Sequence, residues 1–172
     1  MTRAAEEIEL VPYDAGWPAA FAAEAARIRA ALGALALRID HNGSTSIQGL
    51  RAKPIIDIQV SVAALQPLAA YATPLEGLGY THVPHADDAF APFFHRPADW
   101  PHSHHVHVVE YGGREERRTL AFRDYLRDHP QTQTAAEIDD RAHDHLVVQA
   151  VLEILHEGAV DLEPLDRQSL DV

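Results

Sequence analysis

The chain has 172 residues, of which 47% are hydrophobic and 23% are charged. A chain of this length and composition can bury a core, and we expect it to form one domain, 1–172. Its formal net charge of -12 disfavours nonspecific binding to nucleic acid or to an anionic membrane. The absence of cysteine excludes disulfides and thiolate chemistry. The first residues, MTRAAEEIEL, have no signal-peptide core, and no apolar run reaches the ~18 residues of a membrane span. We therefore expect a cytoplasmic protein with no membrane partner.

The first predicted element is a helix within residues 13–35, where Pro18 suits a first helical position. Apolar residues recur there at spacings of four and three, which predicts one buried stripe: Phe21, Ala25, Ile28, Leu32 and Leu35. Gly33 weakens the C-terminal end of this helix. A short strand, LALRID, follows and leads into a turn of small residues that begins at Gly43.

The clearest strand is IIDIQVSV, residues 55–62. Successive side chains of a strand point to opposite faces, so the alternation gives one apolar face and one face that carries Asp57, Gln59 and Ser61. Such a polar face either borders solvent or lines a cleft.

The later elements are a helix within 65–80 that is disturbed at Pro74, and three short strands, YTHV, PFFHR and HHVHVVE. Two helices follow, from 114 to about 129 and from about 134 to 156. The acidic tail, 158–172, has a weak pattern and is expected either to lie over the surface or to fray.

The stretch HNGSTSIQGLRAKPIID, residues 41–57, combines three parts of a phosphate site. Backbone amides in a turn of small residues can bind an anion, and here that turn consists of the following four residues: Gly43, Ser44, Thr45 and Ser46. Lys53 is the single lysine beside thirteen arginines, and its compact ammonium could contact phosphate, although it could equally be a leftover surface lysine. Asp57 could hold a magnesium ion that bridges phosphate oxygens. A Gly-Ser pair alone, by contrast, is usually an ordinary loop.

This stretch resembles the signature of the GrpB family, a branch of the nucleotidyltransferase superfamily related in fold to DNA polymerase beta. The resemblance continues in HHVHVVEYGG and RRTLAFRDYLRDHP and spans about residues 11–130. It implies an α+β fold with a mixed sheet and flanking helices. It also implies that Gly43 and Ser44 lie beside a triphosphate and that Asp57 is the first metal-binding, catalytic carboxylate.

The second carboxylate of the superfamily falls on Gln59. An amide supplies no charge and is a poor magnesium ligand, so the two-metal mechanism is in doubt for this chain. Beyond residue 130 there is a further departure, because the region where family members tend to place a lysine contains none here.

Strand parity places His105 and His107 on one face of HHVHVVE, opposite Val106 and Val108. Together with Asp57 they could bind a transition metal as a two-histidine, one-carboxylate group. Alternatively, they hydrogen-bond a phosphate or cover an open face of the sheet.

Arg123 matches an Arg-Asp pair of the family. Its planar guanidinium could contact a phosphate, and the alternative is an ion pair within or between helices.

Three hypotheses follow. The first is an enzyme that transfers a nucleotidyl group from a nucleoside triphosphate to a small-molecule acceptor, with Mg2+ or Mn2+ as cofactor. The second is a noncatalytic module that binds a nucleotide or a protein partner, because GrpB-like domains also occur fused to dephospho-CoA kinase. The third is a hydrolase that uses another transition metal at Asp57, His105 and His107.

Overall fold

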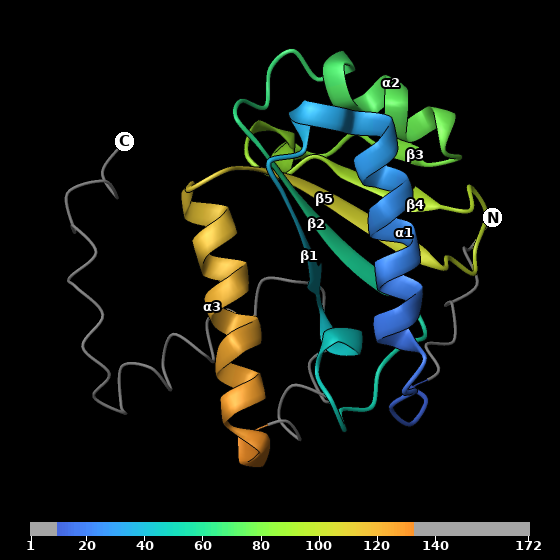
Figure 1. Ribbon diagram of the computed structural model, residues 1–172, viewed down its shortest axis with the longest axis vertical. Helices are drawn as coiled ribbons and strands as arrows, with labels where there is room; N and C mark the ends of the chain where they lie inside the picture. The colour runs from blue at the N-terminus through green and yellow to red at the C-terminus, as the bar shows by residue number, and fades with distance from the viewer. Residues whose placement is uncertain (1–9, 133–172) are drawn as a thin grey trace.

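The computed structural model describes residues 10–132, which form a sheet with helices on both sides (Figure 1). The helices and strands are α1 Trp17–Leu32, β1 Arg38–Asn42, β2 Ile56–Val62, α2 Ala69–Gly77, β3 Thr81–Val83, β4 Phe93–Arg96, β5 His104–Glu110 and α3 Arg114–Asp128. Four short 3-10 turns connect them: η1 Gly33–Leu35, η2 Ser44–Ser46, η3 Ala86–Ala89 and η4 Pro130–Thr132. The predicted α+β class is confirmed. The helix expected at 134–156 and the acidic tail lie outside the described residues.

The sheet has five strands in the order β1-β2-β5-β4-β3. The central pair, β2 and β5, is parallel, and the other neighbours are antiparallel, so the sheet is mixed. A parallel pair requires a long crossover connection, and here that connection contains α2, β3 and β4. The central position of β2 and β5 brings the acid of one strand beside the histidines of the other.

The core lies between the sheet and the helices α1 and α2. The apolar face of β2 is confirmed, since Ile58 and Val60 are fully buried. They belong to one cluster with Ile28 of α1 and with Tyr71 of α2. Figure 1 shows α1 and α2 together and α3 apart from them. None of the helices in residues 10–132 combines the length and the apolar character that crossing a bilayer requires.

Helix α1 carries Pro18 in its first turn, as predicted, but ends at Leu32. Gly33 adopts a φ of 54°, which turns the chain out of the helix. The predicted stripe is therefore wrong at Leu35, which is 45% exposed. Ala36 is buried in its place because the chain has changed direction.

Glu24 is the buried charge of α1, which the apolar stripe did not predict. Its carboxylate accepts hydrogen bonds from Arg27 at 2.7 Å, from Tyr80 at 3.0 Å and from Arg96 at 3.1 Å. Burial raises the pKa of Glu24, but these hydrogen bonds and the charge of Arg96 outweigh it and hold the pKa below its ordinary value. The network ties α1 to the end of β4.

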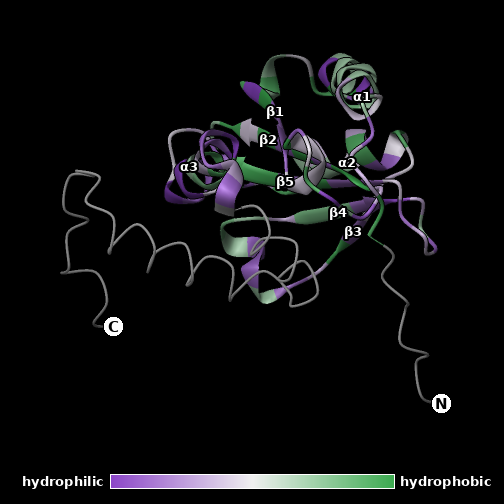
Figure 2. Ribbon diagram, turned by 90° about the horizontal axis from the view of Figure 1, so that it is seen from below, coloured by the Kyte–Doolittle hydropathy of each residue, from purple (hydrophilic) through white to green (hydrophobic). Residues whose placement is uncertain are grey.

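Helix α3 covers the polar face of the sheet and has a largely hydrophilic sequence (Figure 2). Its residue Glu116 accepts a hydrogen bond from Ser61 at 2.6 Å and one from the amide of Gly112 at 2.6 Å. Leu120 and Leu126 of this helix are buried, whereas Tyr125 is only partly buried. The polar face of β2 is thus divided between a part covered by α3 and a part that α3 leaves accessible.

Candidate functional site

The 43–46 turn lies directly against Asp57. Asn42, the last residue of β1, is the register partner of Asp57, so the strand delivers the turn to this carboxylate. Gly43 has a φ of 63°, and a Cβ atom built on it would lie 2.3 Å from Asp57 Oδ2. Glycine is thus required here both by the backbone conformation and by the close approach. The structure brings together the turn and the acid that the sequence predicted.

The turn holds its shape through its own polar groups. Ser46 donates to the carbonyl of Gly43 from its amide at 3.1 Å and from its hydroxyl at 2.6 Å. The hydroxyl of the half-buried Ser44 has no hydrogen-bond partner within residues 10–132. The hydroxyl of Ser44 is therefore available to a ligand, whereas the hydroxyl of Ser46 stabilises the turn through its hydrogen bond to Gly43.

Thr45 anchors the turn to the protein interior. It is 1% exposed, and its hydroxyl donates to the carbonyl of Ile55 at 3.1 Å. His41 Nε2 lies 3.0 Å from the same hydroxyl, and the His41 ring stacks on Phe21. Burial lowers the pKa of His41 to about 4, so this imidazole is neutral at pH 7. The Thr45 side chain is thus bonded within the protein, and the phosphate contact predicted for the backbone amides of this turn stays a prediction.

Lys53 lies on the segment that enters β2. The carbonyl of Lys53 accepts a hydrogen bond from the amide of Ile55 at 2.7 Å. The hydroxyl of Thr45 donates a hydrogen bond to the carbonyl of Ile55, so the segment that contains Lys53 lies next to the 43–46 turn. The side chain of Lys53 is half-buried. Its contact with phosphate stays a prediction.

Asp57 is paired with His105, as strand parity indicates. The two residues are register partners across β2 and β5, and His105 Nδ1 lies 3.4 Å from Asp57 Oδ1. Both side chains remain partly accessible, at 28% for Asp57 and 22% for His105. His107 lies on the same face but is the register partner of Gln59 and packs beside Phe93.

His102 is a neighbour of His105 that the sequence did not reveal. Its Nδ1 lies 3.1 Å from His105 Nε2, and its ring stacks on His95 with centroids 3.9 Å apart. His102 lies in the irregular segment between β4 and β5. The sequence there has no helical or strand periodicity from which the direction of its side chain could be predicted. Within the part of the chain that is described, no three His, Cys, Asp or Glu residues are grouped so as to hold a metal ion. Asp57, His105 and His107 are therefore not grouped around one position in this geometry, and metal binding by Asp57 stays a prediction.

Gln59 lies beneath α3, away from any open metal position. It is 1% exposed, and its Oε1 accepts hydrogen bonds from Thr119 at 2.5 Å and from Asn42 at 3.3 Å. Its Nε2 has no hydrogen-bond partner within residues 10–132. Gln59 is therefore a packing residue under the helix, which explains why a neutral side chain occupies this position.

Arg123 is 8% exposed and locks α3 onto β1. Its guanidinium donates to the carbonyl of His41 at 3.1 Å, to Asp40 at 3.4 Å and to Asp124 at 2.8 Å. The ion-pair alternative is confirmed. The guanidinium is occupied by these partners, so the geometry does not support a phosphate contact by Arg123.

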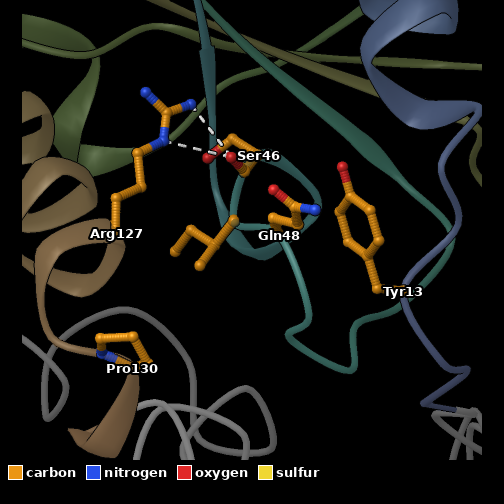
Figure 3. Close-up of a pocket in the computed structure, with 6 residues that line it drawn as sticks. Tyr13, Ser46, Gln48, Arg127 and Pro130 are labelled. Carbon is orange, nitrogen blue, oxygen red and sulfur yellow. Dashed lines mark hydrogen bonds between the residues drawn. The ribbon is translucent and has the colours of Figure 1, made fainter.

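A cavity of about 530 Å3 lies beside the 43–46 turn (Figure 3). Its lining comes from three separate segments of the chain: Tyr13, Ser46, Ile47, Gln48, Arg127 and Pro130. Arg127 donates to the carbonyl of Ser46 from Nε at 3.2 Å and from Nη2 at 3.0 Å. Burial lowers the pKa of Arg127. The sequence did not predict this cavity because its walls meet only in the folded chain.

Comparison with known proteins gives consistent matches. The profile of the family described as "GrpB protein" matches residues 7–137. A UPF0157 protein of Pseudomonas aeruginosa is 42% identical over 128 residues, which cover 73% of this chain and 52% of that protein. The chain thus spans about half the length of this relative. A dephospho-CoA kinase of Mycolicibacterium paratuberculosis is 31% identical, and the match covers 90% of this chain and 42% of the kinase.

Among solved structures, the crystal structure of conserved protein GrpB from Enterococcus faecalis matches with a TM-score of 0.71 at 26% identity. The match covers 87% of this chain and 95% of that chain. The mixed sheet with flanking helices is therefore shared with a solved relative.

Proposed function

Because this chain belongs to the GrpB protein family, we propose that it acts as a nucleotidyltransferase with one divalent ion in its site. It binds a nucleoside triphosphate at the 43–46 turn and at Asp57 and transfers the nucleotidyl group to a small-molecule acceptor. The observation that carries this proposal is the contact of Gly43 with Asp57, where a Cβ atom would lie 2.3 Å from the carboxylate oxygen. Such close approach suits a phosphate that the backbone amides of the turn bind directly and that the acid binds through a cation.

The donor set fits one hard cation. Asp57 provides one accessible carboxylate, and phosphate oxygens and water would provide the other ligands, as is usual for Mg2+ or Mn2+. An ion held there would neutralise charge on the phosphates. Gln59 is excluded from this role by its burial under α3. The proposal therefore differs from the two-ion arrangement of the superfamily.

The residues of the chain have separate tasks in the transfer. Ser44 and Lys53 hold the phosphates, and the acceptor oxygen forms a bond to the α-phosphorus while the bond to pyrophosphate breaks. The imidazole of His105 lies next to Asp57 and that of His102 next to His105, and this pair takes up the proton that the acceptor releases.

Calorimetric titration with ATP, GTP, CTP and UTP, with and without Mg2+ or Mn2+, tests the proposal. We expect binding that requires the cation and that Asp57→Asn removes. Asp99→Asn is the matched control, because Asp99 is an exposed acid of the β4–β5 segment. The absence of heat and of a thermal shift with all four nucleotides would overturn the proposal.

A second candidate function is a noncatalytic accessory module. The burial of Gln59 favours it, because that burial removes one carboxylate of the usual catalytic set. The match to part of a dephospho-CoA kinase is compatible with such a role. A pyrophosphate-release assay separates the two functions. Turnover by the parent chain that Asp57→Asn abolishes would exclude the accessory module.

A further inference from the structure

Trp100 lies at the end of a chain of contacts that begins at Asp57. His105 lies 3.4 Å from Asp57, and His102 lies 3.1 Å from His105. The ring of Trp100 then meets His102 edge to face, with centroids 5.1 Å apart and planes at 69°. Two imidazole rings thus separate the carboxylate from the indole.

The indole is accessible although it is a large apolar group. Trp100 is 39% exposed, whereas Trp17, the other tryptophan of the chain, is 6% exposed in the core. The face of His102 is occupied by the parallel ring of His95. Trp100 has no parallel ring contact within residues 10–132, since its contact with His102 is tilted. Part of the indole surface is therefore accessible beside the polar face of the sheet.

We infer that Trp100 is the platform on which the base of the bound nucleotide stacks. The inference rests on the proposed function, because it takes the phosphates to lie at the 43–46 turn and Asp57. The ribose and the α-phosphate would then lie over the two imidazoles that separate the acid from the indole. Every base has an aromatic face, and stacking is stronger for the larger purines. The site thus prefers purine to pyrimidine nucleotides.

An exposed tryptophan could instead contact a protein partner. The position of Trp100 favours a nucleobase, since it is joined through His102 and His105 to the acid of the candidate site. Binding of a partner would leave nucleotide affinity independent of Trp100. The two occupants are therefore separated by one measurement.

The experiment compares ligands that contain the base, the phosphates or both. Calorimetry of the full chain with Mg2+ uses ATP, CTP, tripolyphosphate and adenosine as probes. Tryptophan fluorescence is recorded in parallel, because Trp17 is buried and Trp100 is the accessible reporter. The variant is Trp100→Ala, and the matched control is Tyr111→Ala, which removes an aromatic residue that is 56% exposed beyond the end of β5.

We expect Trp100→Ala to weaken ATP binding by about five- to hundredfold, the range of one base–aromatic stack, and CTP binding by less. Tripolyphosphate affinity should not change, and Tyr111→Ala should bind all four probes like the parent. ATP should quench the parent fluorescence, whereas tripolyphosphate should not.

The outcomes distinguish the two proposals. Unchanged ATP affinity in Trp100→Ala overturns the platform and leaves the proposed function standing. Adenosine binding that requires Trp100, without tripolyphosphate binding, supports the platform and contradicts the phosphate site. Failure of the parent chain to bind any of the four probes overturns both.

Discussion

Gly43 and Asp57 are packed so closely that the carboxylate occupies the position of a side chain at residue 43: a Cβ atom there would lie 2.3 Å from Oδ2 and 2.8 Å from Cγ. Gly43 also has a positive φ of 63° and an extended ψ of -174°, a conformation that is nearly restricted to glycine. The turn and the acid therefore form one unit, and a change in either should displace the other.

Gly43→Ala should destabilise the chain by about 1–3 kcal/mol and abolish cation-dependent nucleotide binding, because it adds backbone strain and displaces Asp57. Gly49→Ala is the matched control. Gly49 has a φ of 87°, but a Cβ atom added to it would meet no other atom within 4 Å, so this variant adds strain without the clash. Urea unfolding and calorimetry check both variants. Equal behaviour of the two would show that the Gly43–Asp57 contact has no role.

Gln59→Glu should not restore a second metal ligand. The side chain is buried under α3 and already accepts hydrogen bonds from Thr119 and Asn42, so a carboxylate there would be a buried charge. We expect a loss of about 1–3 kcal/mol in the free energy of unfolding and no gain in Mg2+ affinity.

Gln48→Glu, at an exposed position, is the control and should leave stability near that of the parent. Titration of each variant with Mg2+ in the presence of ATP, together with urea unfolding, decides the point. Tighter Mg2+ binding by Gln59→Glu would show that residue 59 faces the ion.

The stability of the chain should decrease in mild acid because of His41. Burial lowers the pKa of His41 to about 4, and the ordinary value of 6.5 applies to the unfolded chain. Between these two values the unfolded chain binds a proton at His41 that the folded chain does not bind. Stability therefore falls as the pH is lowered from about 6.5 to about 4, by about 2–3 kcal/mol for this group.

Urea unfolding at pH 7 and pH 5 measures this loss. His41→Gln removes the titrating ring and should flatten the dependence in that interval. His85→Gln, which changes an exposed ring, should keep the slope of the parent. An unchanged slope in His41→Gln would contradict the assignment. His104, whose pKa burial also lowers, is present in all three chains and cancels in the comparison.

Lys53→Ala should weaken binding of ATP and of tripolyphosphate by about ten- to hundredfold, the effect of losing one charge-assisted hydrogen bond of about 1.5–3 kcal/mol. The free energy of unfolding should change by less than about 0.5 kcal/mol. Lys53→Arg should recover part of the affinity, since a planar guanidinium replaces a compact ammonium poorly.

Arg51→Ala is the matched control for Lys53, because it removes an exposed cation two residues away that donates to the carbonyl of Leu10 at 2.9 Å. Calorimetry with tripolyphosphate compares the two variants. Parental affinity in Lys53→Ala would remove the lysine from the site, and unfolding of that variant would make it a structural residue.

Much of the fold could be predicted from local patterns. The alternation in residues 55–62 identified the two faces of β2, and the parity of HHVHVVE correctly placed His105 on the face of Asp57. The stripe in α1 was correct until Leu35, where the positive φ of Gly33 changes the direction of the chain. Family membership was also predicted from the sequence, because the motifs are long and occur in order.

The candidate site could be predicted only in part. The 43–46 turn and Asp57 are brought together as expected, since β1 and β2 are connected through that turn and pair. The buried roles of Thr45 and Gln59 did not follow from the sequence, because each depends on what packs against it. The ion pair of Arg123 was one of the two alternatives, but its partner Asp40 on β1 was not predicted. Thr45 bonds to Ile55 just before β2, Gln59 to Thr119 of α3, and Arg123 to Asp40 of β1.

Local patterns predicted most of the helices and strands in residues 10–132 and the faces of β2 and β5, because a period of about 3.6 or 2 residues is a local property of the backbone. The strand expected at LALRID is displaced, since β1 runs over Arg38–Asn42 after the turn at Gly33. Only the folded chain connects His102 and Trp100 to Asp57 through His105 and brings Tyr13, Gln48 and Arg127 to the lining of one cavity. These residues lie in irregular segments or in distant elements, where no local period sets a side-chain direction. Their contacts form only when the strands pair and α3 packs onto the polar face of the sheet. That packing depends on many residues of the domain together, not on a local pattern.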